Sequence, residues 1–189
     1  MPDAAPLRLA LLDRAHLHAL HDPLTHHEQV DVRWRDPGVA AAELASGEHD
    51  AALLPVLVVF ALADTRLVPG IGVALVADSS APCDTPEHAA LAQALGADGP
   101  VRLWGAWCAN HTGTPPLPLP LYVWACRRRA PYPRLRRVLT QAWHSAQATG
   151  APPGLRYALG SAEADGLRRL HALTREAGLP INDAPPPFC

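Results

Sequence analysis

The sequence contains no lysine and no strong excess of either charge. Its sixteen basic residues are all arginine, eighteen acidic residues nearly balance them, and the formal net charge is -2 over 189 residues. Because basic and acidic residues are so evenly mixed, the chain has no electrostatic field that would hold a nucleic acid or an anionic membrane surface. We expect neither as a partner. The use of arginine alone, in a chain rich in alanine, proline and leucine, indicates codon bias rather than chemistry.

Signals for disulfides, membrane insertion and nucleotide cofactors are also missing. The four cysteines, at positions 83, 108, 126 and 189, form no CxxC pair, which argues against a zinc ribbon or a disulfide framework. The longest apolar run, 51–63, contains Pro55 and falls short of the roughly 20 residues that span a bilayer. The chain starts without a signal-peptide pattern and carries no glycine-rich phosphate loop. We expect a cytoplasmic protein with no cofactor and no membrane contact.

What the chain does contain is a regular alternation of short apolar runs and capped helices, which is typical of an α/β domain. The predicted strands are 7–12, 30–34, 50–56 and 67–77. The predicted helices are 13–22, 37–46, 86–95, 133–147 and 162–177, the first ending before Pro23. Asp36 and Pro37 open the second helix and Gly47 closes it. The pattern predicts a mainly parallel sheet with helices on both faces.

Ligands of such sheets bind at the carboxyl ends of the strands, so the residues after the first strand are the first candidates for a site. These are Asp13, Arg14, His16 and His18. Arg14 would bind a carboxylate through paired hydrogen bonds, and His16 is the predicted catalytic acid or base. The alternative is that all four are ordinary exposed residues of the first helix.

Three hydroxyl residues are further candidates for substrate binding. Ser79 and Ser80 follow the fourth strand and would donate hydrogen bonds to an anion, although a DSSAP stretch is also an ordinary turn. Thr112, next to Gly113, has the same two interpretations.

Histidines and arginines each form a cluster. Histidines 16, 18, 21, 26 and 27 fall within twelve residues, and zinc or nickel accepts such ligands, but no metal motif is formed and we predict no metal site. The arginines at 127–129, 134, 136 and 137 are interpreted as a strand end and a solvated helix face, with an anion or partner patch as the alternative.

Three segments resemble, in sequence order, parts of the menaquinone-biosynthesis family of the futalosine pathway, which includes chorismate dehydratase. Residues 36–56 carry a helix ending in Leu-x-x-Gly-Glu-x-Asp before an apolar strand, and residues 112–129 carry Thr-Gly and a proline-rich entry to a strand ending near Trp-Ala. Residues 155–180 carry a closing Gly-Leu helix. The resemblance implies a fold like that of type II periplasmic binding proteins, with two α/β lobes and with 119–126 as a strand returning to the first lobe.

Members of that family are longer than this chain, and the shortfall lies between Ala77 and Trp107. The resemblance therefore implies a single α/β domain with its main lobe from 1–78 and 119–189, and with 79–118 as a reduced second-lobe insertion. A homodimer would let a partner subunit supply the other wall of the site.

The activity implied by the resemblance is loss of water from chorismate to give 3-enolpyruvyl-benzoate, the reaction of a carbon-oxygen lyase. The chain departs from the family at two places. Asp13 to His16 replace a Ser-Tyr-x-Asn-like turn, and Pro55 to Val58 replace small hydroxyl residues and a glutamate. The alternative is a non-catalytic small-carboxylate-binding or oligomeric accessory protein. Either function predicts a small aromatic or cyclic carboxylate as the ligand.

Overall fold

The computed structural model describes residues 5–77, 86–97, 103–110 and 116–188. Six strands form one sheet in the order β2-β1-β3-β5-β4-β6. They are β1 Leu7–Leu11, β2 Val30–Trp34, β3 Ala51–Pro55, β4 Thr65–Leu75, β5 Leu119–Arg127 and β6 Leu155–Arg156. Every strand predicted from the sequence is present, including the returning strand, which lies inside the sheet as β5.

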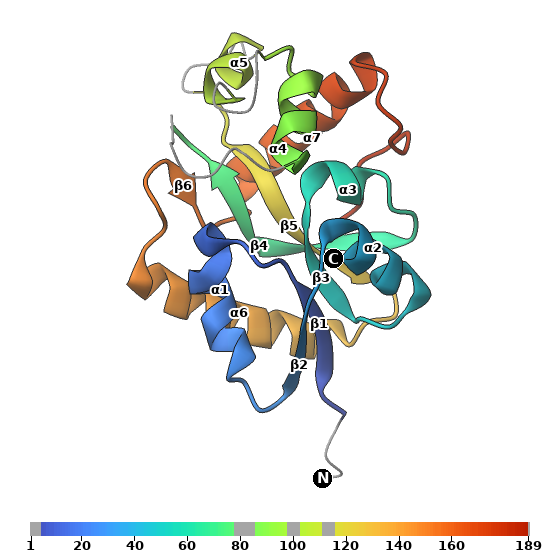
Figure 1. The fold of residues 1–189 in the computed structure, drawn as a ribbon, viewed down its shortest axis with the longest axis vertical. Coiled ribbons are helices and arrows are strands. Elements are labelled where there is room, and N and C mark those ends of the chain that lie inside the picture. The colour runs from blue at the N-terminus through green and yellow to red at the C-terminus, as the bar shows by residue number, and fades with distance from the viewer. Residues whose placement is uncertain (1–4, 78–85, 98–102, 111–115, 189) are drawn as a thin grey trace.

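The helices cover both faces of this sheet, as the sequence predicts. They are α1 His18–Thr25, α2 Pro37–Ser46, α3 Val56–Phe60, α4 Pro86–Ala94, α5 Leu103–Ala109, α6 Tyr132–Thr149 and α7 Ser161–Glu176, and a 3-10 turn, Ala15–Leu17, precedes α1. Helix α1 packs on α6, and α2 contacts α3 on the other side of the sheet (Figure 1). Gly47 follows α2 with φ of 90°, a left-handed conformation that glycine adopts without strain.

The sheet is mixed, which corrects the prediction of a mainly parallel one. Strand β1 is parallel to β2 and β3, whereas β5 is antiparallel to β3 and β4, and β6 is antiparallel to β4. The chain leaves the sheet at the end of β4 and returns to it at that same edge. A strand that enters from there must run against its neighbours, so β5 is antiparallel to both.

Contacts between distant segments explain two further differences from the sequence predictions. Helix α1 continues through Pro23 because Leu20 and Leu24 are buried and α1 packs on α6, which offsets the hydrogen bond that proline removes. Helix α5 was not predicted. Its Leu103 and Trp107 are buried, and the Trp107 Nε1 donates to the Leu117 carbonyl at 2.6 Å.

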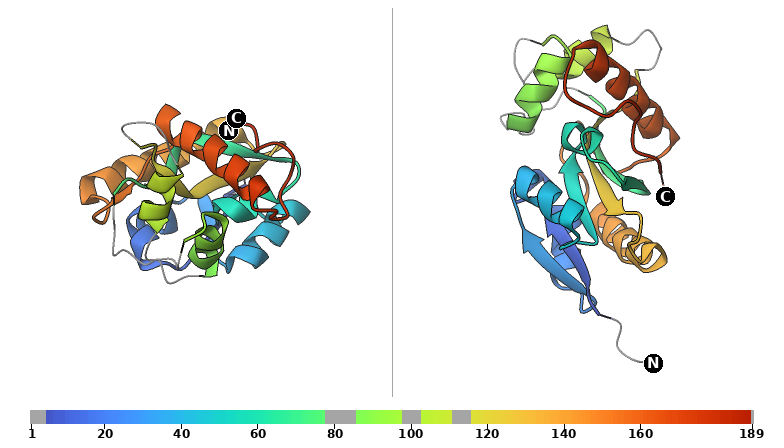
Figure 2. Two further views of the ribbon diagram at one scale, coloured as in Figure 1. Left: turned by 90° about the horizontal axis from the view of Figure 1, so that it is seen from above. Right: turned by 90° about the vertical axis from the view of Figure 1, so that its right-hand side faces the viewer.

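Helices α4, α5 and α7 lie together beyond one edge of the sheet (Figure 2, right). The Asn110 side chain donates to the Leu95 carbonyl at 3.2 Å, which joins α5 to α4, and Arg169 on α7 donates to the Asn110 carbonyl at 3.0 Å. Among the described residues between β4 and β5 there are these two short helices and no strand. The assignment of 79–118 to a reduced second lobe remains a prediction. In the described part of the chain, no helix is both long and apolar enough to cross a membrane.

Candidate functional site

The strand directions bring one end of each of the six strands to the edge of the sheet that faces α4, α5 and α7. Strands β1, β2, β3 and β4 end there, and β5 and β6 begin there, because β5 and β6 run against the other strands. We call residues 12–16, 55–56 and 119–122 the inner edge. The opposite edge, where β1, β3 and β4 begin and β5 ends, is called the outer edge.

His16 and Tyr122 meet at the inner edge although 106 positions separate them in sequence. Their ring centroids are 5.4 Å apart, and the side chains sit in the buried interior, His16 at 5% exposure and Tyr122 at 0%. The Tyr157 hydroxyl donates to the His16 carbonyl at 2.6 Å and thereby fixes the turn that carries the imidazole. Burial raises the pKa of Tyr157, so this hydroxyl stays protonated and remains a donor at neutral pH.

Of the other predicted residues on this turn, Arg14 is the least exposed. It is half-buried, and its Nη1 donates to the Asp13 carbonyl at 3.0 Å. Asp13 and His18 instead form an exposed pair, with 3.4 Å between Oδ1 and Nε2. Such surface pairs contribute at most about 1 kcal/mol to folding, and their side chains are on the solvent side of the turn.

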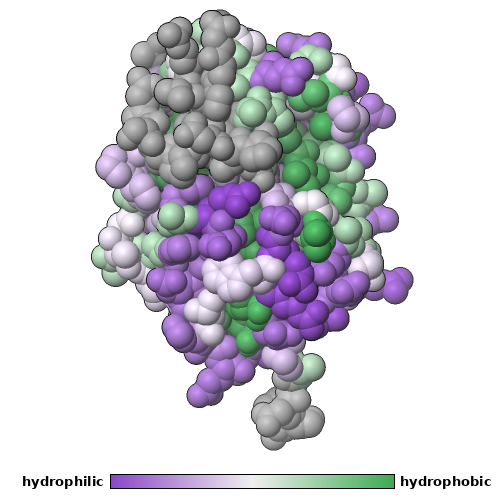
Figure 3. Space-filling view, in the orientation of Figure 1, coloured by the Kyte–Doolittle hydropathy of each residue, from purple (hydrophilic) through white to green (hydrophobic). Residues whose placement is uncertain are grey.

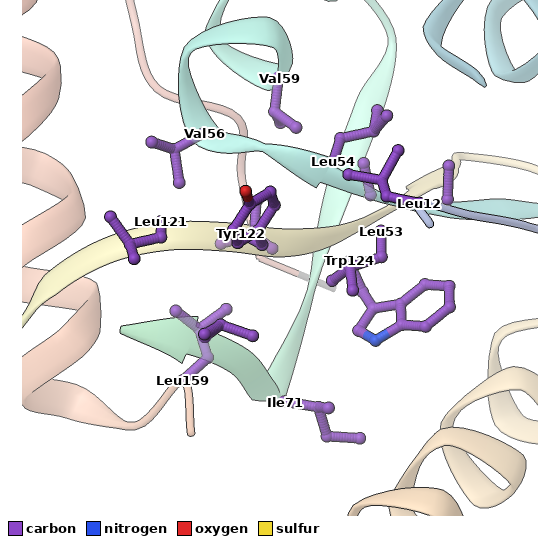
Figure 4. Packing of buried hydrophobic residues seen from close by; sticks show 14 of the residues in the cluster. Leu12, Leu53, Leu54, Val56, Val59, Ile71, Leu121, Tyr122, Trp124 and Leu159 are labelled. Carbon is purple, nitrogen blue, oxygen red and sulfur yellow. The ribbon is translucent and has the colours of Figure 1, made fainter. Parts of the chain in front are cut away.

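An apolar wall completes the described part of the inner edge. Pro55, the last residue of β3, pairs with Tyr122 on β5, and Val56, Val59 and Phe60 of the following helix are buried. Figure 4 shows Tyr122 on β5 among apolar side chains contributed by β3 and α3. These fully buried side chains form the apolar surroundings of Tyr122.

The sequence analysis also named three hydroxyl residues and a histidine cluster. Ser79, Ser80 and Thr112 lie outside the described residues. The histidine cluster is spread out: His21 is fully buried with its ring edge-on to Trp34 at 5.2 Å between centroids, whereas His26 is exposed at the end of α1. Burial, together with the nearby His18 and His16, lowers the pKa of His21 to about 3. Within the described segments, no three His, Cys, Asp or Glu side chains are close enough to hold a metal ion.

Sequence reasoning missed Tyr122 and Tyr157. Tyr122 lies in the segment expected as the returning strand, and only the strand register and the ring contact show that it reaches His16, on the turn after β1. The available signal was a phenolic hydroxyl within a buried strand, because a buried tyrosine usually needs a polar partner.

Comparison with known proteins shows the fold but no family. No family model matches the sequence, and no curated protein matches it. Protein AF1704 from Archaeoglobus fulgidus superposes with a TM-score of 0.66, at 14% identity, over 92% of this chain and 98% of that one. The CA3427 gene product of Candida albicans, described as exhibiting the generic periplasmic binding protein fold, superposes with a TM-score of 0.53, at 9% identity, over 93% of this chain and 90% of its own.

The chain has a periplasmic-binding-protein-like fold. This confirms the α/β fold class predicted from the sequence. Both solved chains are covered almost completely, so they match this chain in extent as well as in topology. At such low identities the likeness concerns the fold and leaves the chemistry to be argued from the inner edge itself.

Proposed function

We propose that the inner edge binds a small aromatic or cyclic carboxylate, and that the chain is a cytoplasmic menaquinone-biosynthesis protein resembling chorismate dehydratase. The observation that carries this proposal is the contact between the rings of His16 and Tyr122, with Arg14 two residues away on the same turn. In periplasmic-binding-protein-like and other α/β folds this is the edge at which ligands bind.

Each group has a role in the proposed reaction. Arg14 binds a ring carboxylate through its guanidinium. Dehydration removes a proton from one ring carbon and hydroxide from its neighbour. Neutral His16 takes the proton, and the resulting imidazolium gives it to the departing hydroxyl so that water leaves and the aromatic product forms. Tyr157 holds His16 in place through its backbone.

The test is turnover of chorismate by the purified chain, with product identified by mass spectrometry. His16→Gln should lower kcat by about 10²- to 10⁴-fold, the range for losing a general acid-base group. His26→Gln is the matched control, because His26 is an exposed histidine close in sequence, and it should leave kcat unchanged. Turnover that survives His16→Gln intact would exclude the assigned role.

A second function is favoured by the apolar character of residues 55–58, where a dehydratase would be expected to supply hydroxyl groups. All four side chains are apolar, and residues 56–58 begin α3. A non-catalytic carboxylate-binding or oligomeric accessory protein would bind benzoate, measured by calorimetry, without turning over chorismate at high protein concentration. Light scattering would then distinguish a monomer from a homodimer. A protein that neither binds benzoate nor converts chorismate would exclude both functions.

A further inference from the structure

A pocket lies at the outer edge, far from His16. It has a volume of about 530 Å³ and lies between the end of α2, the start of β4 and the turn after β5. Its lining consists of Leu44, Ala45, Ala63, Asp64, Thr65, Arg127, Arg128 and Arg129. Tyr122 and Arg127 are five residues apart on β5, so at about 3.4 Å per residue roughly 17 Å separate the two sites.

The three arginines differ in how firmly they are held. Arg127 is fixed, since its Nη2 contacts the Asp50 carboxylate at 3.2 Å and its Nε donates to the His49 carbonyl at 3.1 Å. Arg128 lies 3.7 Å from the Asp64 carboxylate, and these side chains are 59% and 87% exposed, so a ligand can displace the contact. Arg129 makes no hydrogen bond or ion pair with any residue in the described part of the chain.

A buried hydroxyl gives an independent sign of a ligand. Thr65, the first residue of β4, is only 4% exposed, and its Oγ1 has no hydrogen-bond partner among the described residues. It pairs in register with Arg127 and lines the same pocket as the arginines. Buried hydroxyls in proteins are nearly always hydrogen-bonded, so the pocket offers a donor that an anion oxygen would satisfy.

We propose that this pocket binds a small organic phosphate monoester. The lining carries three arginines and one aspartate, a formal charge of +2 that matches a phosphate dianion. Arg128, Arg129 and the Thr65 hydroxyl donate to the phosphate oxygens, and Arg127 adds positive charge from a fixed position. The exposed side chains of Ala45 and Ala63 supply an apolar surface for the organic part, and the volume is that of a small-molecule site.

Calorimetric titration of the full chain with phenyl phosphate and with inorganic phosphate tests this proposal. Phenyl phosphate should bind about tenfold more tightly than inorganic phosphate, because only the ester has an apolar group to place on Ala45 and Ala63. Arg129→Ala and Thr65→Val should each weaken phenyl phosphate binding by about tenfold, and Thr65→Ser should retain it. His16→Gln should leave it unchanged, which separates this site from the proposed function of the inner edge.

The matched control is Arg168→Ala, which removes one exposed arginine that pairs with Asp165 on α7 and lies outside the pocket. It should change the affinity by less than twofold. An equal loss in Arg168→Ala and Arg129→Ala would mean a nonspecific charge effect and would overturn the proposal. Absence of binding, or binding that survives both Arg129→Ala and Thr65→Val in folded protein, would overturn it as well.

Discussion

The two edges of the sheet use polar groups in opposite ways. At the inner edge the described polar side chains in the interior, His16, Tyr122 and Tyr157, are uncharged or titratable and lie among apolar neighbours. At the outer edge, Arg8, Asp50 and Arg127 form a network of permanent charges. On the face shown in Figure 3, hydrophilic residues likewise gather over the lower half, which contains β1, β2 and α1. The buried polar groups of the inner edge are thus hydroxyls and an imidazole, whereas at the outer edge the buried Asp50 carboxylate is paired with two arginines.

Asp50 illustrates the structural use of charge. Its carboxylate accepts hydrogen bonds from the Arg8 backbone at 3.0 Å, from the Arg8 Nη2 at 3.0 Å and from the Arg127 Nη2 at 3.2 Å. Burial alone would raise the pKa of Asp50, but the hydrogen bonds from Arg8 and Arg127 outweigh it and lower the pKa. One carboxylate therefore ties the residue before β3 to β1 and β5.

The largest effect is expected when this outer-edge network is broken. Asp50→Ala should lower the free energy of unfolding by about 3 kcal/mol, because two guanidinium groups and a backbone N–H lose their acceptor. Urea denaturation measures the change. Asp183→Ala is the control, since the fully exposed Asp183 pairs only loosely with Arg175 at 3.5 Å, and it should change stability by less than about 0.5 kcal/mol. Equal effects would show that the network adds nothing beyond a surface pair.

Lowering the pH should destabilise the protein through His21, a fully buried histidine of α1. In the folded protein its pKa is about 3, whereas in the unfolded chain it returns to its ordinary value of 6.5. The unfolded state therefore binds more protons between these values, and the free energy of unfolding falls as the pH falls through this window. Between pH 8 and pH 5 this one group should remove about 2 kcal/mol.

Comparison of denaturation at the two pH values in His21→Leu gives the measurement. The substitution removes the titrating group while His16, His18 and Asp13, the charged or titratable residues that act on it, remain. The loss of stability between pH 8 and pH 5 should shrink by about 2 kcal/mol. His26→Gln, at an exposed position, should leave this loss of stability unaltered. If His21→Leu and the unmodified chain were equally sensitive to acid, His21 would be ruled out as the cause.

Asp50 has a lowered pKa, so its contribution to stability is lost only at lower pH, as the pH falls past its ordinary value of 3.8.

Gly166 tests how tightly the inner edge is packed against α7. A Cβ at this helix position would clash with the Pro118 carbonyl and lie 3.3 Å from the Pro120 side chain at the start of β5. Gly166→Ala should therefore destabilise the protein by about 1 to 3 kcal/mol despite the higher helix propensity of alanine. Gly105→Ala on α5, where a Cβ meets nothing within 4 Å, should instead stabilise the protein by about 0.5 kcal/mol. Thermal melts of both variants measure the contrast, and stabilisation of both would show that α7 is free to move.

The smallest effect is expected from the hydroxyl that holds the His16 turn. Tyr157→Phe removes the 2.6 Å hydrogen bond to the His16 carbonyl and should lower the free energy of unfolding by about 1 kcal/mol. The matched control is Tyr132→Phe, at a tyrosine that is only partly buried on the first turn of α6. If the inner edge is active, Tyr157→Phe should also lower kcat while leaving the overall fold intact by circular dichroism. Unchanged stability and an unchanged kcat would show that the Tyr157 hydroxyl does not hold the His16 turn.

Local patterns predicted much of this fold. Apolar runs identified β1 and β3, and the proline after Asp36 and the left-handed Gly47 bounded α2, because these signals depend on neighbouring residues. The direction of β5 and the continuation of α1 through Pro23 depend on contacts between distant segments, which no local pattern encodes. The residues of the candidate site were likewise predicted only where the signal was local. His16 was predicted from its position after a strand, but its partner Tyr122 became visible only through the register of β3 and β5.

The central place of β5 sets the order in which a growing chain can acquire its structure. Strands β3 and β4 each form their main ladder with β5, which begins 44 positions after the end of β4. Until the ribosome has released residues 119–127, both strands present open edges to other nascent chains. Translation of the segment between Leu75 and Leu119 is therefore a period of exposure, and chaperone binding should be greatest on ribosome-bound chains arrested within it.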